Sequence, residues 1–112
     1  MHRRGKVYFR DTLAGVLEES EEGYTFSYNG DYLNSETPLP VSLTLPLTRD
    51  KYVSRELFPF FDGLIPEGWL LDIATINWKL NPNDRMGLLL EFCGDTIGAV
   101  TIVPEKEAGD DI

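Results

Sequence analysis

The side chains that most often do chemistry in proteins are scarce in this sequence. It has one histidine, His2, and one cysteine, Cys93, among 112 residues. A structural zinc site or a histidine-activated nucleophile needs more groups than these two residues can supply. Cys93 follows Phe92 at the apolar end of an expected helix, which favours burial as a small hydrophobic residue. The sequence therefore predicts no catalytic residue, no metal site and no cofactor.

Two further patterns look like chemical sites, but local structure explains both. Glu67 and Asp72 flank Trp69, yet a carboxylate pair acts as acid and base only when one member is desolvated. Acidic residues near a helix start opened by Pro66 instead favour the helix dipole. The run Gly94-Asp-Thr-Ile-Gly98 lacks the lysine and the glycine spacing of a phosphate-binding loop and leads into a strand. We expect a protein that is not an enzyme.

Trp69 is the strongest candidate for a binding residue. It follows Pro66-Glu-Gly68 at a helix entrance, where side chains often protrude. Tryptophan is also among the residues most enriched at interface hot spots. Packing of Trp69 in the core is an equally good interpretation of the sequence alone. Trp78 differs, because its helical spacing from Leu71 favours a partly buried position.

The charge of the chain argues against nucleic acid as a direct partner. Nineteen acidic residues against ten basic ones leave a net charge of −9, which a duplex would repel. The basic residues near the N-terminus are expected to be solvated; they are His2, Arg3, Arg4, Lys6 and Arg10. No apolar run approaches the roughly 20 residues of a membrane span, no secretory apolar region follows the first residues, and a lone cysteine suits a reducing compartment. We expect a cytoplasmic protein with protein partners and no membrane contact.

Alternation of apolar and polar residues predicts five strands, at 6–9, 12–17, 24–28, 41–47 and 96–103. The first two form a hairpin around Arg10-Asp11, an acidic turn at 18–23 precedes the third, and Asn29-Gly-Asp31 follows it. In the fourth, alternate residues from Val41 to Leu47 share one face, and Pro46 places this strand at an edge or ends it.

Helical spacing of apolar residues predicts three helices between the fourth and fifth strands, at 54–65, 66–80 and 84–92. Ser54 is a candidate N-cap for the first, which otherwise begins near Leu57 with Pro59 in its first turn. Asp84 caps the third, and Gly94 closes it.

These elements define an α+β fold, with a small, mostly antiparallel sheet and about three helices inserted before the last strand. We expect one domain over residues 1–112, folded from 6 to 104, with 105–112 as a flexible tail.

Three blocks of the sequence, in this order, resemble the N-terminal subdomain of HipA-family kinases. They are Pro40-Val-Ser-Leu-Thr-Leu-Pro-Leu47, Phe60-Phe-Asp-Gly-Leu-Ile-Pro-Glu67 and Gly94-Asp-Thr-Ile-Gly-Ala-Val-Thr-Ile-Val-Pro-Glu105. The resemblance runs from about residue 6 to residue 107. It implies a small α+β subdomain of the kind that is stacked on the N-lobe of the kinase. The family's catalytic residues lie downstream, and because this sequence stops at Ile112 we expect neither a nucleotide site nor a catalytic aspartate.

In that respect the chain resembles the free-standing HipS antitoxins of three-component HipBST toxin–antitoxin systems. The resemblance implies a HipA-like serine/threonine kinase toxin, HipT, as the partner, with the DNA-binding protein HipB in a ternary complex. The implied kinase-binding residues are Trp69, Leu64, Ile65, Glu67, Gly68, Leu70 and Asp72. Trp69 is the expected anchor, with Glu67 and Asp72 meeting basic residues around the nucleotide site of the kinase.

Two other interpretations remain open at this point. The chain could be an excised N-terminal piece of an ordinary HipA toxin, although the polar end from Glu105 to Ile112 argues mildly against this. It could instead be an acidic DNA mimic, but its carboxylates are scattered through turns and not aligned like phosphates.

Overall fold

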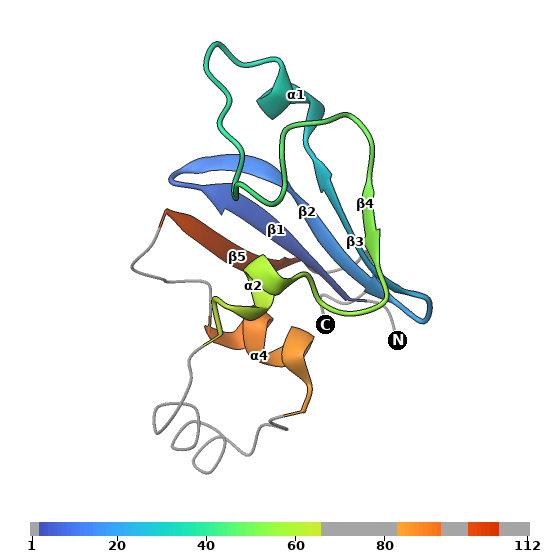
Figure 1. The fold of residues 1–112 in the computed structure, drawn as a ribbon. Coiled ribbons are helices and arrows are strands. Elements are labelled where there is room, and N and C mark those ends of the chain that lie inside the picture. Colours follow the sequence, from blue (N-terminus) through green and yellow to red (C-terminus); the bar gives the residue numbers. More distant parts are fainter. Residues whose placement is uncertain (1–2, 66–82, 93–98, 106–112) are drawn as a thin grey trace.

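The computed structural model describes residues 3–65, 83–92 and 99–105. These residues form one five-stranded sheet with short helices (Figure 1). The strands are β1 (Arg3–Phe9), β2 (Thr12–Ser20), β3 (Gly23–Tyr28), β4 (Tyr52–Ser54) and β5 (Val100–Glu105). Their order in the sheet is β4-β3-β2-β1-β5, and every neighbouring pair is antiparallel. The last strand therefore returns beside the first, and the predicted α+β fold is confirmed.

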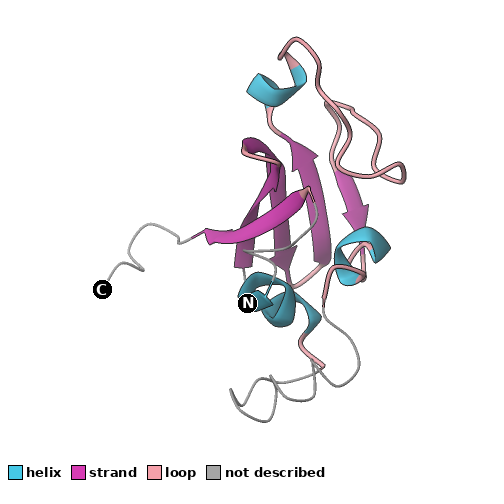
Figure 2. Ribbon diagram, turned by 90° about the vertical axis from the view of Figure 1, so that its left-hand side faces the viewer, coloured by secondary structure: helices cyan, strands magenta, loops and turns pink. Residues whose placement is uncertain are grey.

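Three helices belong to the described part of the chain: α1 (Gly30–Leu33), α2 (Pro59–Asp62) and α4 (Arg85–Phe92). Helix α1 lies at the opposite end of the molecule from α2 and α4 (Figures 1 and 2). None of the helices in the described ranges is long and apolar enough to cross a bilayer. The predicted helix at 66–80 lies outside the described residues.

The β1–β2 hairpin follows the prediction, and its turn needs an unusual backbone conformation. Arg10 has a φ of 57°, and its N–H donates to the carbonyl of Ala99, just before β5. Strand β2 continues to Ser20, so the predicted acidic turn at 18–23 shrinks to Glu21 and Glu22. The sheet extends from Arg3 to Glu105, slightly beyond the expected limits of 6 and 104.

The predicted strand from Val41 to Leu47 is wrong. The segment contains only an isolated bridge between Ser42 and Leu45, which closes a tight turn. Val41 and Leu45 are buried, at 5% and 3% exposed, but Leu43 between them is 94% exposed. The backbone of Val41 and Leu45 forms hydrogen bonds with a side chain and not with a neighbouring strand. The N–H of Val41 donates to the hydroxyl of Tyr28 at 3.0 Å, and that hydroxyl donates to the carbonyl of Leu45. An alternation of apolar and polar residues can thus occur in a turn, where only two of the apolar side chains, Val41 and Leu45, are buried.

Ser54 is not a helix cap, and this prediction also is wrong. It is the last residue of β4, where it pairs with Tyr24 of β3. Helix α2 instead begins at Pro59, with Phe58 as its N-cap residue and Gly63 at its C-terminus. Proline is well suited to the first helical position because the N–H it lacks would have had no partner within the helix. The alternative prediction, with Pro59 in the first turn, is therefore confirmed.

Helix α4 is capped as predicted. The Asp84 carboxylate accepts a hydrogen bond from the N–H of Gly87 at 3.1 Å, in the first turn of the helix. The expected closing residue, Gly94, lies outside the described ranges.

The core lies between one face of the sheet and the helices α2 and α4. Phe26 of β3 and Phe61 of α2 are fully buried, with ring centroids 5.4 Å apart. Gly5 allows α4 to approach β1 closely, because a β-carbon there would lie 2.8 Å from Leu90 Cδ2 and 2.9 Å from Ile102 Cγ2. The other large side chains that are fully or almost fully buried are Val7, Leu17, Ile65, Met86, Leu88, Leu89 and Ile102. This packing fixes α2 and α4, the elements on either side of residues 66–82.

Candidate partner-binding surface

The predicted kinase-binding residues centre on the segment that follows α2. Leu64 is partly buried and packs against the core, and Ile65 is only 2% exposed. The side chain of Ile65 therefore belongs to the core of this domain and is not a free surface in the chain alone. The other five predicted residues, Glu67, Gly68, Trp69, Leu70 and Asp72, lie outside the described residues, as does Trp78. The structure does describe α2 and α4, the helices on either side of residues 66–82.

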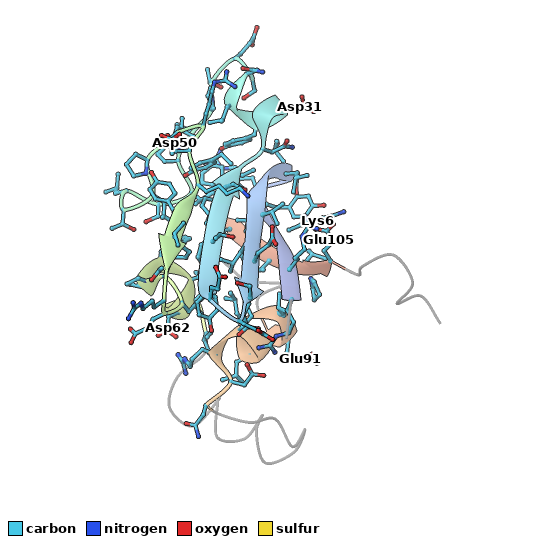
Figure 3. All side chains as sticks on the ribbon, turned by 90° about the vertical axis from the view of Figure 1, so that its right-hand side faces the viewer. Lys6, Asp31, Asp50, Asp62, Glu91 and Glu105 are labelled. Carbon is cyan, nitrogen blue, oxygen red and sulfur yellow. The ribbon has the colours of Figure 1, made fainter. Side chains whose placement is uncertain are left out.

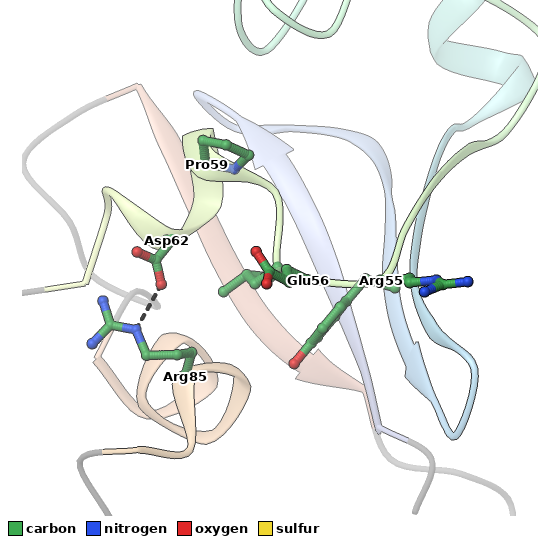
Figure 4. Close-up of a pocket in the computed structure, with 7 residues that line it drawn as sticks. Arg55, Glu56, Pro59, Asp62 and Arg85 are labelled. Carbon is green, nitrogen blue, oxygen red and sulfur yellow. Dashed lines mark hydrogen bonds and ion pairs between the residues drawn. The ribbon is translucent and has the colours of Figure 1, made fainter.

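Helices α2 and α4 are held together by an ion pair. The guanidinium Nε of Arg85 donates to Asp62 Oδ1 at 2.6 Å (Figure 4). Both side chains are about a third or more exposed, so the pair adds little stability in water. Its effect is geometric, because it connects the last residue of α2 to the first residue of α4. Sequence reasoning missed this pair, since nothing in the sequence links residues 23 positions apart.

A second ion-pair cluster attaches β1 to the start of α4. Arg3 donates through its two terminal nitrogens to Asp84, at 2.9 Å and 2.7 Å, and through Nε to Glu19 Oε1 at 2.6 Å. Arg3 and Glu19 lie directly across from each other in the sheet, and Tyr24 lies across from Glu19 on the next strand. The Tyr24 hydroxyl donates to Glu19 Oε2 at 3.2 Å. The prediction that Arg3 is merely solvated is therefore wrong.

The electrostatics of this cluster follow from its contacts. The hydrogen bonds from Arg3 hold the pKa of the Asp84 carboxyl below its usual range, and the N–H of Gly87 acts in the same direction. The two carboxylates in turn raise the pKa of Arg3, chiefly through the hydrogen bond to Asp84. Burial and the nearby Glu19 raise the pKa of Tyr24. The shifts of Arg3 and Asp84 favour their ion-paired forms, and the shift of Tyr24 favours its neutral hydroxyl, which donates to Glu19, so the cluster connects β1 and β3 to the start of α4.

A pocket of about 540 Å³ lies between this end of the sheet and the two helices (Figure 4). It is lined by Tyr24, Arg55, Glu56, Leu57, Pro59, Asp62 and Arg85. Its lining carries charges of both signs, and Arg55 points to the opposite side from Arg85 (Figure 4). The lining includes no histidine or cysteine, and the described ranges contain no group of three potential metal ligands.

Acidic side chains of the described residues lie at both ends of the domain. Figure 3 shows Asp31 and Asp50 toward the α1 end, Asp62 and Glu91 toward α2 and α4, and Glu105 on β5. In the part of the chain that the structure describes, these labelled carboxylates are not gathered into the single row with which a DNA mimic would imitate phosphates.

Comparison with known proteins shows which family this domain resembles. The sequence profile of the HipA N-terminal domain matches residues 5–103. An uncharacterized protein of Haemophilus influenzae is 36% identical over 105 residues, which are 94% of this chain and 95% of that protein. The putative kinase Y4mE of Sinorhizobium fredii is 29% identical over 102 residues, but the match spans only 24% of its length.

Solved structures agree with the sequence relatives. The N-terminal domain of HipA toxin superposes with a TM-score of 0.73 at 32% identity, over 94% of both chains. A chain from the Shewanella oneidensis complex of HipA, HipB and operator DNA superposes with a TM-score of 0.71 at 24% identity. That match covers 92% of this chain and 24% of the other, and it shows a shared fold.

The fold and its surface thus define a small α+β domain of the kind found at the N-terminus of HipA toxins. The chain belongs to the HipA N-terminal domain family.

Proposed function

We propose that this chain is an antitoxin that binds a separate HipA-like serine/threonine kinase, HipT, and neutralises it by direct contact in the cytoplasm. The observation that carries the proposal is the relative from Haemophilus influenzae, which this domain matches over 95% of its length. A HipA N-terminal domain that makes up nearly a whole protein is what a free-standing partner of a kinase would look like.

The longer relative supports a kinase as the partner. This domain corresponds to 24% of the putative kinase Y4mE, so the same domain occurs within a chain about four times as long. A separate copy of the domain would keep the surface that faces the rest of such a chain. It would then bind a kinase at the position that the fused domain otherwise occupies.

The segment from Pro66 to Pro82 is the proposed binding element. It joins α2 to α4, and both helices are fixed to the core and to each other through Arg85 and Asp62. We assign Trp69 as the anchor, with Leu64, Gly68 and Leu70 beside it and Glu67 and Asp72 meeting basic groups of the kinase. The net charge of −9 would accelerate the encounter with a basic surface.

The DNA-binding protein HipB would complete a ternary complex with the kinase and this chain, and HipB would make the contact with DNA. This assignment agrees with the charge of the chain, which disfavours its own contact with DNA.

Binding to the kinase tests the proposal. The chain is co-expressed with a HipA-like kinase that lacks this domain, and the kinase is isolated through a tag. We expect the wild-type chain to co-purify and the Trp69→Ala variant to be lost. Val53→Ala is the matched control, since Val53 is 74% exposed on β4 and its truncation should leave both folding and binding unchanged. Equal recovery of Trp69→Ala and the wild type would remove Trp69 as the anchor, and no recovery of either would remove the proposal.

The second candidate is a structural subdomain at the start of a full-length HipA-type kinase, which the match to part of Y4mE favours. An epitope tag at the N-terminus of the native gene separates the two candidates. A tagged product near 12.7 kDa supports the antitoxin, whereas a product of the size of a kinase supports the subdomain.

A further inference from the structure

The most exposed large apolar side chain of the described residues lies far along the chain from Trp69. Leu43 is 94% exposed at the tip of the turn from Ser42 to Leu45. The turn is closed by a hydrogen bond from the N–H of Leu45 to the carbonyl of Ser42 at 3.0 Å. The Ser42 hydroxyl also accepts from the N–H of Thr44 at 3.1 Å and bonds the Thr44 hydroxyl at 2.9 Å. The apolar tip therefore stands on a turn with a defined backbone.

Three tyrosines fix this loop to the rest of the domain. The hydroxyl of Tyr32 donates to the carbonyl of Leu39 at 2.6 Å, and that of Tyr52 donates to the carbonyl of Pro46 at 2.6 Å. Between them, the buried hydroxyl of Tyr28 bonds both Val41 and Leu45, at the base of the turn. A loop held at three points by side chains from two strands and a helix has already lost the freedom that binding would otherwise remove.

The loop is also uncharged. From Thr37 to Thr48 no residue is charged, in a chain where 26% of residues are. Leu39, at 49% exposed, is a second apolar side chain in the same stretch. The centres of protein interfaces are depleted of charged residues, so this stretch suits an uncharged apolar surface on a partner.

We propose that the turn at Ser42–Leu45 is a second docking element, in which Leu43 inserts into an apolar hollow on the HipA-like kinase. The inference rests on the proposed function. The proposed partner of the turn is the kinase, because a domain similar to this one forms part of the longer chain of the putative kinase Y4mE. A loop that is preorganised, uncharged and tipped with leucine has the features of an interface centre, because little further ordering is needed on binding. In contact with a kinase it adds affinity without adding charge to an acidic molecule.

The test is the affinity of the full chain for the purified kinase. We expect Leu43→Asp to weaken binding at least about tenfold, because a charge would enter a desolvated apolar contact. Leu43→Met keeps the apolar bulk and should bind within about threefold of the wild type, since volume-conserving apolar exchanges are well tolerated. Val53→Asp is the control for added negative charge at an exposed apolar position, and it should bind like the wild type.

The outcomes separate this inference from the proposed function. If the wild type binds the kinase and Leu43→Asp binds equally well, the docking role of Leu43 is wrong while the antitoxin proposal stands. If the wild type does not bind, the proposed function itself fails. Light scattering of the chain alone completes the test: a dimer that Leu43→Asp converts to monomer would assign the turn to self-association and overturn the kinase contact. Circular dichroism melting of each variant confirms that it is folded before binding is compared.

Discussion

Arg3 and Asp84 are 81 positions apart in the chain, and they form a two-point ion pair between the first strand and the start of α4. The guanidinium matches both carboxylate oxygens, a geometry stronger than a single contact. Asp84 at the same time caps α4 through the N–H of Gly87. One carboxylate thus fixes both the position and the first turn of the helix that follows the proposed binding segment.

Loss of this pair should destabilise the domain measurably. We expect Arg3→Ala and Asp84→Asn each to lower the free energy of unfolding by about 1–2 kcal/mol, since both groups are only partly buried. The double variant should lose less than the sum of the two, because the residues act on each other. Urea unfolding of the four proteins gives the coupling. Arg55→Ala removes an exposed arginine elsewhere and should change stability by less than about 0.5 kcal/mol. Strict additivity would show that the pair contributes nothing.

The same pair predicts how stability responds to acid. The pKa of Asp84 is lower in the folded chain than its ordinary value, so its contribution is complete above that ordinary value, near 4. The contribution is lost as the pH falls through the lower pKa of the folded state. The stability difference between wild type and Asp84→Asn should therefore be constant from neutral pH to about 5 and shrink toward pH 3. Melting temperatures across this range measure it, and a difference that grows in acid would contradict the assignment.

Tyr28→Phe should weaken both the core and the loop that carries Leu43. Burial raises the pKa of Tyr28 to about 12, and its hydroxyl accepts from Val41 and donates to Leu45. Removing it leaves two buried backbone groups without this partner, which should cost about 1–3 kcal/mol of unfolding free energy. Because the raised pKa favours the neutral hydroxyl in the folded chain, wild type should also lose stability between about pH 10 and 12 that Tyr28→Phe does not lose. Denaturant unfolding at pH 7 and pH 11 tests both statements.

Alanine substitutions at two glycines, Gly5 and Gly30, test how closely α4 packs on the sheet. Gly5→Ala places a methyl group within 2.9 Å of Leu90 and Ile102, so we expect a loss of about 1–3 kcal/mol from overpacking. At Gly30 no atom lies within 4 Å of the new methyl group, so Gly30→Ala should be neutral or slightly stabilising. Equal melting temperatures for the two variants would show that α4 does not pack tightly on β1.

The sequence predicted the parts of this fold that depend on neighbouring residues. The β1–β2 hairpin, the cap at Asp84 and the place of Pro59 in the first turn of α2 all follow from local patterns, and the structure confirms them. The strand expected from Val41 to Leu47 failed because its backbone partners are tyrosine hydroxyls from elsewhere in the chain. Strand β4 was missed because three residues are too few for an alternation to be visible.

The candidate site was less predictable than the fold. The ion pairs that fix its flanks, Arg3 with Asp84 and Arg85 with Asp62, join residues that no sequence spacing relates. The exposure of Leu43 opposes the pattern that placed it on one face with Val41 and Leu45, which are buried. The residues from Glu67 to Asp72 stay predictions, resting on residue type and on the family resemblance.

The central claim is that this domain neutralises a kinase, and growth measures it most directly. Cells in which a HipA-like kinase lacking this domain is induced stop growing, and the chain is supplied from a second promoter as wild type, Trp69→Ala or Val53→Ala. The proposal predicts that the wild type and Val53→Ala restore growth and that Trp69→Ala does not, at equal protein levels. Continued arrest in the presence of abundant, folded wild-type chain would contradict the antitoxin function.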